Sequence, residues 1–281
     1  MSGVDEIDVG FCFYDDPDYR ADADRDSRKL RNWHQQLWSK PLPSGRLLQW
    51  SLEPGTSCLT YDGFRVSSDT IATTHANYQR AGAAQLWAGM TKTEQDEYER
   101  AFYTIGGFII FPSRPQSLNQ RRGTSPAIAD RFDLTLECIR QHYNGSVENP
   151  LADVLAADAE YFCLFGDGRA GFATFIEFFH LQDLASPESV RWLDGHEGRE
   201  WRFDHPPLPV TADAYRRYLD NVAGFVAARN DRIRDWCDAS VSSNLSQDPG
   251  WRRDDASSRE ALIHRQVAIR PLGTDATSSR R

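Results

Sequence analysis

Apolar residues recur at helical spacing in several parts of the chain. Five positions after Ser27 share one face of a predicted helix: Leu30, Trp33, His34, Leu37 and Trp38. Thr91 and Glu94 have the spacing of a capping box, which predicts the start of a second helix. A long final helix is predicted to open at Thr211, because apolar residues recur at helical spacing from there to Ile233.

Two more helices are predicted in the middle of the chain. Residues 127–143 carry an apolar stripe, and Ser125-Pro126 before them is a good helix start. Serine can cap the first turn, and proline fits the first helical position. Residues 172–184 are apolar on nearly every side, which favours a central, buried helix.

Shorter apolar runs predict strands. Residues 58–61 and 64–67 flank Asp62-Gly63, and an Asp-Gly pair between apolar runs is a strong hairpin signal because both residues tolerate positive φ. The continuous apolar run over residues 107–111 is typical of a strand buried on both faces. The sheet is therefore expected to be small and mostly antiparallel.

These elements predict an α+β fold with one globular domain over residues 1–240. Residues 11–14 are expected to add an early strand, and residues 186–209, rich in proline, glycine and charge, a long surface loop. After about Ser240 the chain turns to serine, arginine and aspartate with few large apolar side chains. Such a composition buries too little apolar surface to offset the entropy of ordering. Residues 241–281 are therefore expected to form a disordered polar tail.

Composition and charge argue against several classes of protein. No apolar run approaches the roughly 20 residues that a membrane-crossing helix needs. The acidic start of the chain does not resemble a secretory signal, which begins with basic residues and continues with an apolar stretch. A cytoplasmic location is therefore expected. The net charge of −9 gives no strong nucleic-acid signal, because phosphate neutralisation dominates non-specific binding to DNA.

The sequence lacks complete metal and nucleophile motifs. Its five cysteines are widely spaced without a C-x-x-C pair, which argues against a zinc site. Glu177 and His180 have the Glu-x-x-His spacing of di-iron bundles, but the second pair that such a site needs is missing from the sequence. Neither a metal nor a cofactor is expected. Arg28 and His34 loosely fit the arginine–histidine spacing of one class of helical ribonuclease toxins, although His34 also fits a packed apolar face.

The polar, doubly basic loop over residues 119–125 is the best candidate site. Its predicted ligand residues are Asn119, Arg121, Arg122 and Ser125. The loop runs into the predicted helix start, where free backbone N–H groups and the helix dipole favour an anion. Adjacent arginines would add charge-assisted hydrogen bonds. The alternative is a solvated loop whose arginines pair with Asp130 and Asp133.

Three motifs resemble signatures of an uncharacterised bacterial domain-of-unknown-function family. They are LWSKPLPSG at residues 37–45, TIGGxxxFP at residues 104–112 and IADRFDLTLECIR at residues 128–140. The resemblance extends over about residues 30–233, and it implies no known reaction. Compared with the family pattern, His180 stands in place of an expected leucine. In the polar loop the pattern matches Asn119, Arg122 and Gly123.

Two function classes follow from these observations. The first is a protein, an enzyme or a plain binder, that takes a phosphate-bearing small molecule or a nucleotide at the loop of Asn119 and Arg122. The second is a non-catalytic interaction module whose aromatic surface binds an unknown protein partner. A ribonuclease-type toxin or defence protein is a remote third alternative.

Overall fold

The computed structural model describes residues 6–42, 44–75, 82–146, 148–197 and 201–246 of the 281-residue chain. The chain divides into two compact units, Met1–Cys237 and Asp238–Arg281. In the described ranges no helix is long and apolar enough to span a membrane.

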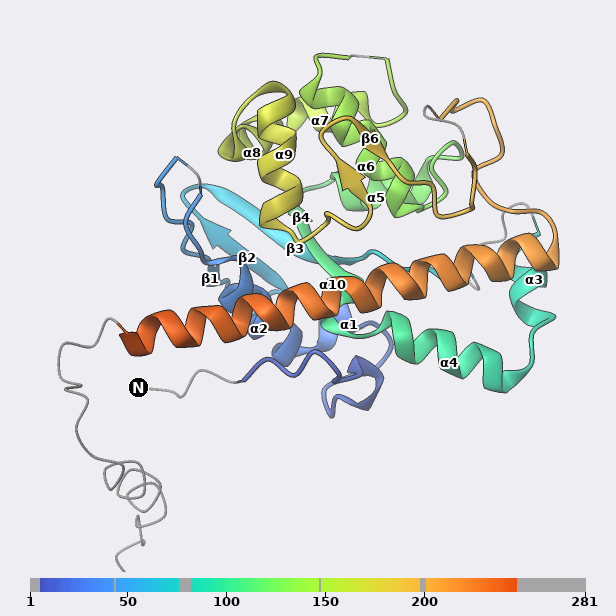
Figure 1. The fold of residues 1–281 in the computed structure, drawn as a ribbon, viewed down its shortest axis with the longest axis horizontal. Coiled ribbons are helices and arrows are strands. Elements are labelled where there is room, and N and C mark those ends of the chain that lie inside the picture. The colour runs from blue at the N-terminus through green and yellow to red at the C-terminus, as the bar shows by residue number, and fades with distance from the viewer. Residues whose placement is uncertain (1–5, 43, 76–81, 147, 198–200, 247–281) are drawn as a thin grey trace, which may run out of the picture. The chain divides into compact units, whose positions relative to one another are not determined.

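Four antiparallel strands form the main sheet in the order β1-β2-β3-β4 (Figure 1). They are β1 (Ser51–Leu52), β2 (Cys58–Tyr61), β3 (Phe64–Thr70) and β4 (Phe108–Pro112). The predicted hairpin is confirmed, since β2 and β3 turn at Asp62 and Gly63, whose φ angles are 47° and 84°. The five residues of β4 are all buried, as predicted. Pro112 lies within β4 because this strand is at the edge of the sheet, where a missing N–H is tolerated.

Helices account for most of the remaining regular structure. They are α1 (Ala23–Asp26), α2 (Arg28–Trp38), α3 (Ala83–Ala88), α4 (Lys92–Phe102), α5 (Leu118–Thr124), α6 (Phe132–Tyr143), α7 (Ala152–Ala157), α8 (Ala159–Phe162), α9 (Gly168–Phe178) and α10 (Ala212–Ser246). Short 3-10 turns cover Phe13–Asp15, Ile105–Gly107 and Cys163–Phe165, and a small hairpin joins β5 (Ala185–Ser186) to β6 (Ser189–Val190). The fold is therefore α+β, as predicted.

The predicted helix starts at α2 and α4 are confirmed by their caps. Ser27 Oγ accepts a hydrogen bond from the Leu30 N–H at 2.9 Å. Thr91 and Glu94 form a complete capping box, in which each side chain accepts from the backbone of the other. The apolar face of α2 is buried along its whole length, so periodicity alone located this helix correctly.

Aromatic contacts connect the sheet with the helices around it. Phe132 of α6 lies 6.5 Å from Phe111 of β4 and 6.3 Å from Phe225 of α10, measured between ring centroids. Trp38, at the end of α2, lies 5.0 Å from Phe179, which follows α9. These contacts place Phe132 of α6 beside both β4 and α10, and they bring the ends of α2 and α9 close together.

The helix predicted from residue 127 begins five residues later, so the expected helix start at Ser125 is wrong. Ser125 instead closes α5, and its N–H donates to the Arg121 carbonyl. Ala129 and Asp130 have left-handed φ angles of 47° and 64°, which interrupt the helix. Arg122 holds this turn, since its guanidinium donates to the Asp130 carbonyl and its own carbonyl accepts from the Asp130 N–H.

Three other predicted segments also differ. Residues 11–14 form no strand, because Phe13 enters a 3-10 turn and packs edge-on against Trp33 and Phe108. The described part of the expected surface loop at residues 186–209 contains part of a hairpin and five buried apolar side chains. These five are Val190, Trp192, Leu193, Trp201 and Leu208. The helix predicted to reach residue 184 ends at Phe178.

The final helix extends past the predicted domain boundary at Ser240 and ends at Ser246. Thr211 precedes it as predicted, and its Oγ1 accepts from the Ala214 N–H at 3.3 Å. Most of the predicted disordered tail, residues 247–281, lies outside the described residues.

Candidate functional site

Arg122, the central residue of the predicted anion site, is fully buried and surrounded by acceptors. Its Nη1 donates to Asp69 Oδ2 and to the Thr70 carbonyl, each at 2.7 Å. Its Nη2 donates to the Asp130 carbonyl at 3.0 Å, and its Nε donates to Thr135 Oγ1 at 3.2 Å. The Asp130 carboxylate adds an ion pair at 3.3 Å. Arg122 therefore joins α5 to β3 and to the turn before α6.

The other three predicted ligand residues meet separate partners. Arg121 is exposed and pairs with Asp153 at 3.5 Å. Asn119 Nδ2 donates to Ser67 Oγ at 3.2 Å from the first turn of α5, whereas Ser125 caps the opposite end. The structure thus spreads these groups along a short helix, and phosphate binding by them stays a prediction.

His34, half of the toxin-like pair, is buried and hydrogen-bonded through both ring nitrogens. Trp38 Nε1 donates to His34 Nδ1 at 2.9 Å. An indole nitrogen can only donate, so Nε2 carries the imidazole proton and faces Ser68 Oγ at 2.9 Å. Burial lowers the pKa of His34 to about 3, while Arg28 is exposed. This geometry favours a packed, neutral histidine that fixes the Trp38 ring.

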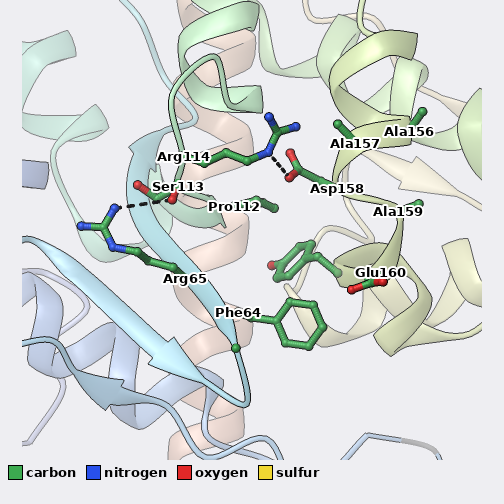
Figure 2. Close-up of a pocket in the computed structure, with 12 residues that line it drawn as sticks. Phe64, Arg65, Pro112, Ser113, Arg114, Ala156, Ala157, Asp158, Ala159 and Glu160 are labelled. Carbon is green, nitrogen blue, oxygen red and sulfur yellow. Dashed lines mark hydrogen bonds and ion pairs between the residues drawn. The ribbon is translucent and has the colours of Figure 1, made fainter.

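A cleft of about 500 Å³ opens between the β2–β3 turn, the end of β4 and the helices α7 and α8 (Figure 2). Arg114 Nε pairs with Asp158 Oδ1 at 2.7 Å. Arg65 lies on the other side of Ser113, where its Nη1 donates to the Ser113 carbonyl at 3.5 Å, and it pairs with Glu53 at 2.8 Å. Each arginine of this cleft therefore has a carboxylate partner.

A second cleft, of about 420 Å³, lies where the segment after α2 meets α9 and α10. We call it the Lys40 cleft, and its lining residues are Lys40, Pro41, Leu42, Thr174, Glu177, Phe178, His180, Gln182 and Trp236. Its volume is in the range of small-molecule sites. Lys40 follows the end of α2 by two residues and is only 9% exposed.

Three aromatic rings surround the Lys40 amine. Nζ lies 4.6 Å from the ring centroid of Phe178, 4.9 Å from that of Trp38 and 5.0 Å from that of Trp236. The rings come from α9, α2 and α10, so the cage exists only when these three helices are assembled. Ring faces attract a cation, but they also exclude the water that would solvate it.

His180 is the polar contact of the Lys40 amine. Lys40 Nζ lies within hydrogen-bond distance of His180 Nε2, at 3.2 Å. His180 has a left-handed φ of 56°, an uncommon conformation for a residue with a side chain. This turn ends α9 and directs the imidazole to the amine. Strained backbone of this kind is often found at functional sites.

Burial, and then the positive charge of Arg229, lower the pKa of Lys40 to about 7, although Glu177 and Cys237 act in the opposite direction. Burial, followed by Lys40 and Arg229, lowers the pKa of His180 to about 3. Near neutral pH the imidazole is therefore uncharged, and the Lys40 amine is divided between its charged and neutral forms. A neutral amine in a cleft can act as a base or a nucleophile.

Arg229 adds a second cation beneath the same tryptophan. Its guanidinium carbon lies 5.7 Å from the Trp38 ring centroid. It donates to the carbonyls of Phe179, Gly106 and Phe108 at 2.9, 2.7 and 2.6 Å. Its Nη2 has no hydrogen-bond partner among the described residues. Burial lowers the pKa of Arg229 to about 9.

The sequence reasoning missed Lys40, although two signals could have found it. The residue is part of the LWSKPLPSG motif, which resembles a family signature. Lysine is also scarce, because the chain has only Lys29, Lys40 and Lys92 among its 32 basic residues. A residue type that is rare in the chain and lies inside a motif is a candidate for a specific role. The burial of the amine follows from tertiary contacts and could not be predicted from either signal.

Within the described ranges no group of three or more histidine, cysteine, aspartate or glutamate side chains could hold a metal ion. Glu177 and His180 both line the Lys40 cleft, so their Glu-x-x-His spacing does bring them to one site. His180 there contacts the Lys40 amine, which is not a ligand of di-iron centres.

Comparison with known proteins identifies a family but no activity. A family model described as a family of unknown function (DUF6994) matches residues 7–233. No curated protein and no solved structure matches the chain. The matched range includes the sheet, the helices α1 to α9 and most of the Lys40 cleft, with Trp236 just beyond it. The chain therefore belongs to the DUF6994 family of unknown function.

Proposed function

We propose that this protein binds a small anionic molecule of the phosphate-bearing class in the Lys40 cleft. The observation that carries the proposal is an excess of positive charge at the cleft. Lys40 and Arg229 lie against the same tryptophan, and the described residues supply neither with a carboxylate within ion-pair distance.

The other fully buried arginines in the part of the chain that the structure describes differ from Arg229 in this respect. Arg122 pairs with Asp69 and Asp130, and Arg131 pairs with Asp133 and, at 2.8 Å, with Asp194. Buried charges are costly unless an opposite charge pairs with them, so two neighbouring cations without a carboxylate partner favour an external anion.

The charged surroundings of the cleft agree with such a ligand. Glu177 lines the cleft but is exposed to solvent, which screens its charge. Arg232 follows Arg229 along α10 and pairs with Asp183. Its positive charge is one of the causes that lower the pKa of His180. An anion in the cleft would stabilise the protonated form of Lys40, so its binding should be accompanied by proton uptake near neutral pH.

Isothermal titration with inorganic phosphate and with glycerol 3-phosphate tests the proposal. Lys40→Met keeps most of the side-chain volume and removes the charge, so it should weaken binding by about tenfold or more. Lys92→Met is the matched control, because Lys92 is exposed and pairs with Asp96 at 2.6 Å. The affinity of the parent protein should fall as the pH rises through about 7, where Lys40 loses its proton.

Arg121→Ala separates this proposal from the site predicted at the polar loop. If Arg121→Ala loses phosphate binding while Lys40→Met keeps it, the loop is the anion site and the Lys40 cleft is not. Binding of neither phosphate compound to the parent protein would instead favour the class of modules that only bind a protein partner.

A further inference from the structure

Lys40 is one of the few lysines in a chain whose basic residues are mostly arginines. Lys29 and Lys92 are both at least partly exposed to water. Lys29 lies over the Phe11 ring at 4.0 Å, and Lys92 forms an ion pair within α4. Only Lys40 is buried in a cleft. Arginine would supply a stronger charge there, but its guanidinium stays protonated near neutral pH and is no nucleophile.

The position of the amine fits nucleophilic chemistry better than a structural charge. Lys40 lines a cleft large enough for a small molecule, which gives a ligand access to this residue. The Phe178, Trp38 and Trp236 rings exclude water around it, and lysines desolvated in this way are activated nucleophiles. The hydrogen bond between the amine and His180 Nε2 helps to fix the orientation of the amine.

We infer that Lys40 forms an imine with a small aldehyde or ketone that carries an anionic group. This inference rests on the proposed function, since the anionic group is the feature that the positive cleft would bind. The carbonyl group is the additional feature, and it defines the substrate class.

The step requires no oxidant, reductant or cofactor. The Nζ lone pair attacks the carbonyl carbon, and the π electrons of the C=O bond move to oxygen. One proton passes from nitrogen to that oxygen to give a carbinolamine. The C–O bond then breaks, the oxygen leaves as water with a second proton from nitrogen, and a C=N bond forms. The products are one imine and one water molecule.

The surroundings of Lys40 support both halves of this step. A neutral amine is needed for the attack, and the lowered pKa of Lys40 provides it near neutral pH. The positive field of Arg229 favours an anionic group close to the amine. Once protonated, the imine withdraws electrons from the neighbouring carbon, which is how lysine enzymes activate adjacent C–H and C–C bonds.

Reductive trapping with three matched compounds tests the inference. Dihydroxyacetone phosphate carries a ketone and a phosphate, glycerol 3-phosphate carries an alcohol in place of the ketone, and dihydroxyacetone lacks the phosphate. The full chain is incubated with each compound and sodium cyanoborohydride, which reduces imines to stable amines. Intact mass then counts the adducts, and peptide mapping locates them among the three lysines and the N-terminal amine.

Dihydroxyacetone phosphate is expected to label the peptide that contains Lys40 in preference to those of Lys29 and Lys92. Glycerol 3-phosphate should give no adduct but should slow the labelling by occupying the cleft. Lys40→Arg should lose the adduct, while Lys29→Arg and Lys92→Arg should keep it. Because the parent protein reports the labelled position directly, the test does not depend on the folding of Lys40→Arg.

The outcomes separate the inference from the proposed function. If glycerol 3-phosphate binds but no ketone labels Lys40, imine formation is disproved and anion binding stands. If dihydroxyacetone labels Lys40 as fast as its phosphate ester does, the amine is nucleophilic and the anion preference is disproved. Equal labelling of all amines would show that Lys40 has no special reactivity and would overturn the inference.

Discussion

At the scale of single residues, the environment of Lys40 sets two effects against each other. Cation–π contacts with three rings favour the charged amine, each by roughly 0.5–2 kcal/mol. Removal from water favours the neutral amine, and burial is the largest cause of the fall in the pKa of Lys40 from 10.5 to about 7. A buried amine without a carboxylate partner is therefore partly neutral near neutral pH.

This balance predicts the titration of Lys40. Its rate of acylation by a small reagent, followed by mass spectrometry, should rise with pH with a midpoint near 7. Lys92 is the internal control, because its hydrogen bond to Asp96 raises its pKa. Glu177→Gln should move the Lys40 midpoint to lower pH, since Glu177 raises this pKa. A Lys40 midpoint close to 10.5 would show that the amine is hydrated.

The same lowered pKa predicts how stability depends on pH. Between about pH 7 and pH 10.5 the unfolded chain holds a proton on Lys40 that the folded chain has lost, so folding stability gains as the pH rises. Lys40→Met removes this contribution. Urea denaturation should therefore find Lys40→Met stabilised relative to the parent at pH 6, with the difference shrinking towards pH 10. A difference that does not change with pH would contradict the burial of this charge.

At the scale of elements, the contact between α10 and β4 depends on a glycine. The Gly106 N–H donates to Asn230 Oδ1 at 2.7 Å, and Asn230 Nδ2 donates to Thr104 Oγ1 at 2.8 Å. Arg229, the preceding residue, donates to the carbonyls on either side of Gly107. The TIGG motif thus forms the docking surface for α10, and α10 in turn brings Trp236 to the Lys40 cleft.

A pair of glycine substitutions tests this docking. A Cβ at Gly106 would lie 2.5 Å from Asn230 Oδ1 and 2.7 Å from the Val226 carbonyl. Gly106→Ala should therefore lower the free energy of unfolding by about 1–3 kcal/mol. Gly224→Ala places its Cβ in open space within α10 and should raise stability by up to about 1 kcal/mol. Equal effects of the two substitutions in urea denaturation would argue against close packing at Gly106.

The elements that could be predicted are those that local sequence determines. α2 and α4 have side-chain caps and regular apolar faces, and the β2–β3 turn has residues that accept positive φ. The start of α6 could not be predicted, because the guanidinium of Arg122 holds Asp130 in a left-handed turn from another helix. The end of α9 depends in the same way on the left-handed turn at His180.

At the scale of the Met1–Cys237 unit, three buried arginines connect segments that are distant in sequence. Arg122 joins α5 to β3, Arg131 joins the start of α6 to Asp194 and the Pro207 carbonyl, and Arg229 joins α10 to β4 and to the end of α9. The sequence is rich in arginine, so nothing in its pattern distinguishes these three from those at the surface. The candidate site lies beside Arg229, the one of the three whose side-chain hydrogen bonds go to carbonyl groups alone.

Arg122 and Arg121 offer a matched test of the role of the buried arginines, since they are adjacent and differ in burial. Arg122→Ala would leave the Asp69 and Asp130 carboxylates without their buried partner, which typically costs about 3–5 kcal/mol of stability. Arg121→Ala removes only an exposed ion pair with Asp153 and should change stability by less than about 1 kcal/mol. Urea denaturation of the two variants measures both values.

The effect of pH on the stability of Arg122→Ala tests whether the buried carboxylates cause its loss of stability. Burial raises the pKa of Asp69 to about 6, and Arg122 opposes this rise. Without Arg122 the pKa of Asp69 should be higher still. Protonation of Asp69 should therefore stabilise the variant more than the parent as the pH falls. The stability difference should therefore be largest above about pH 7 and should narrow towards pH 5. If Arg122→Ala instead keeps the stability of the parent and loses phosphate binding, Arg122 is a ligand residue and the polar loop, not the Lys40 cleft, is the anion site.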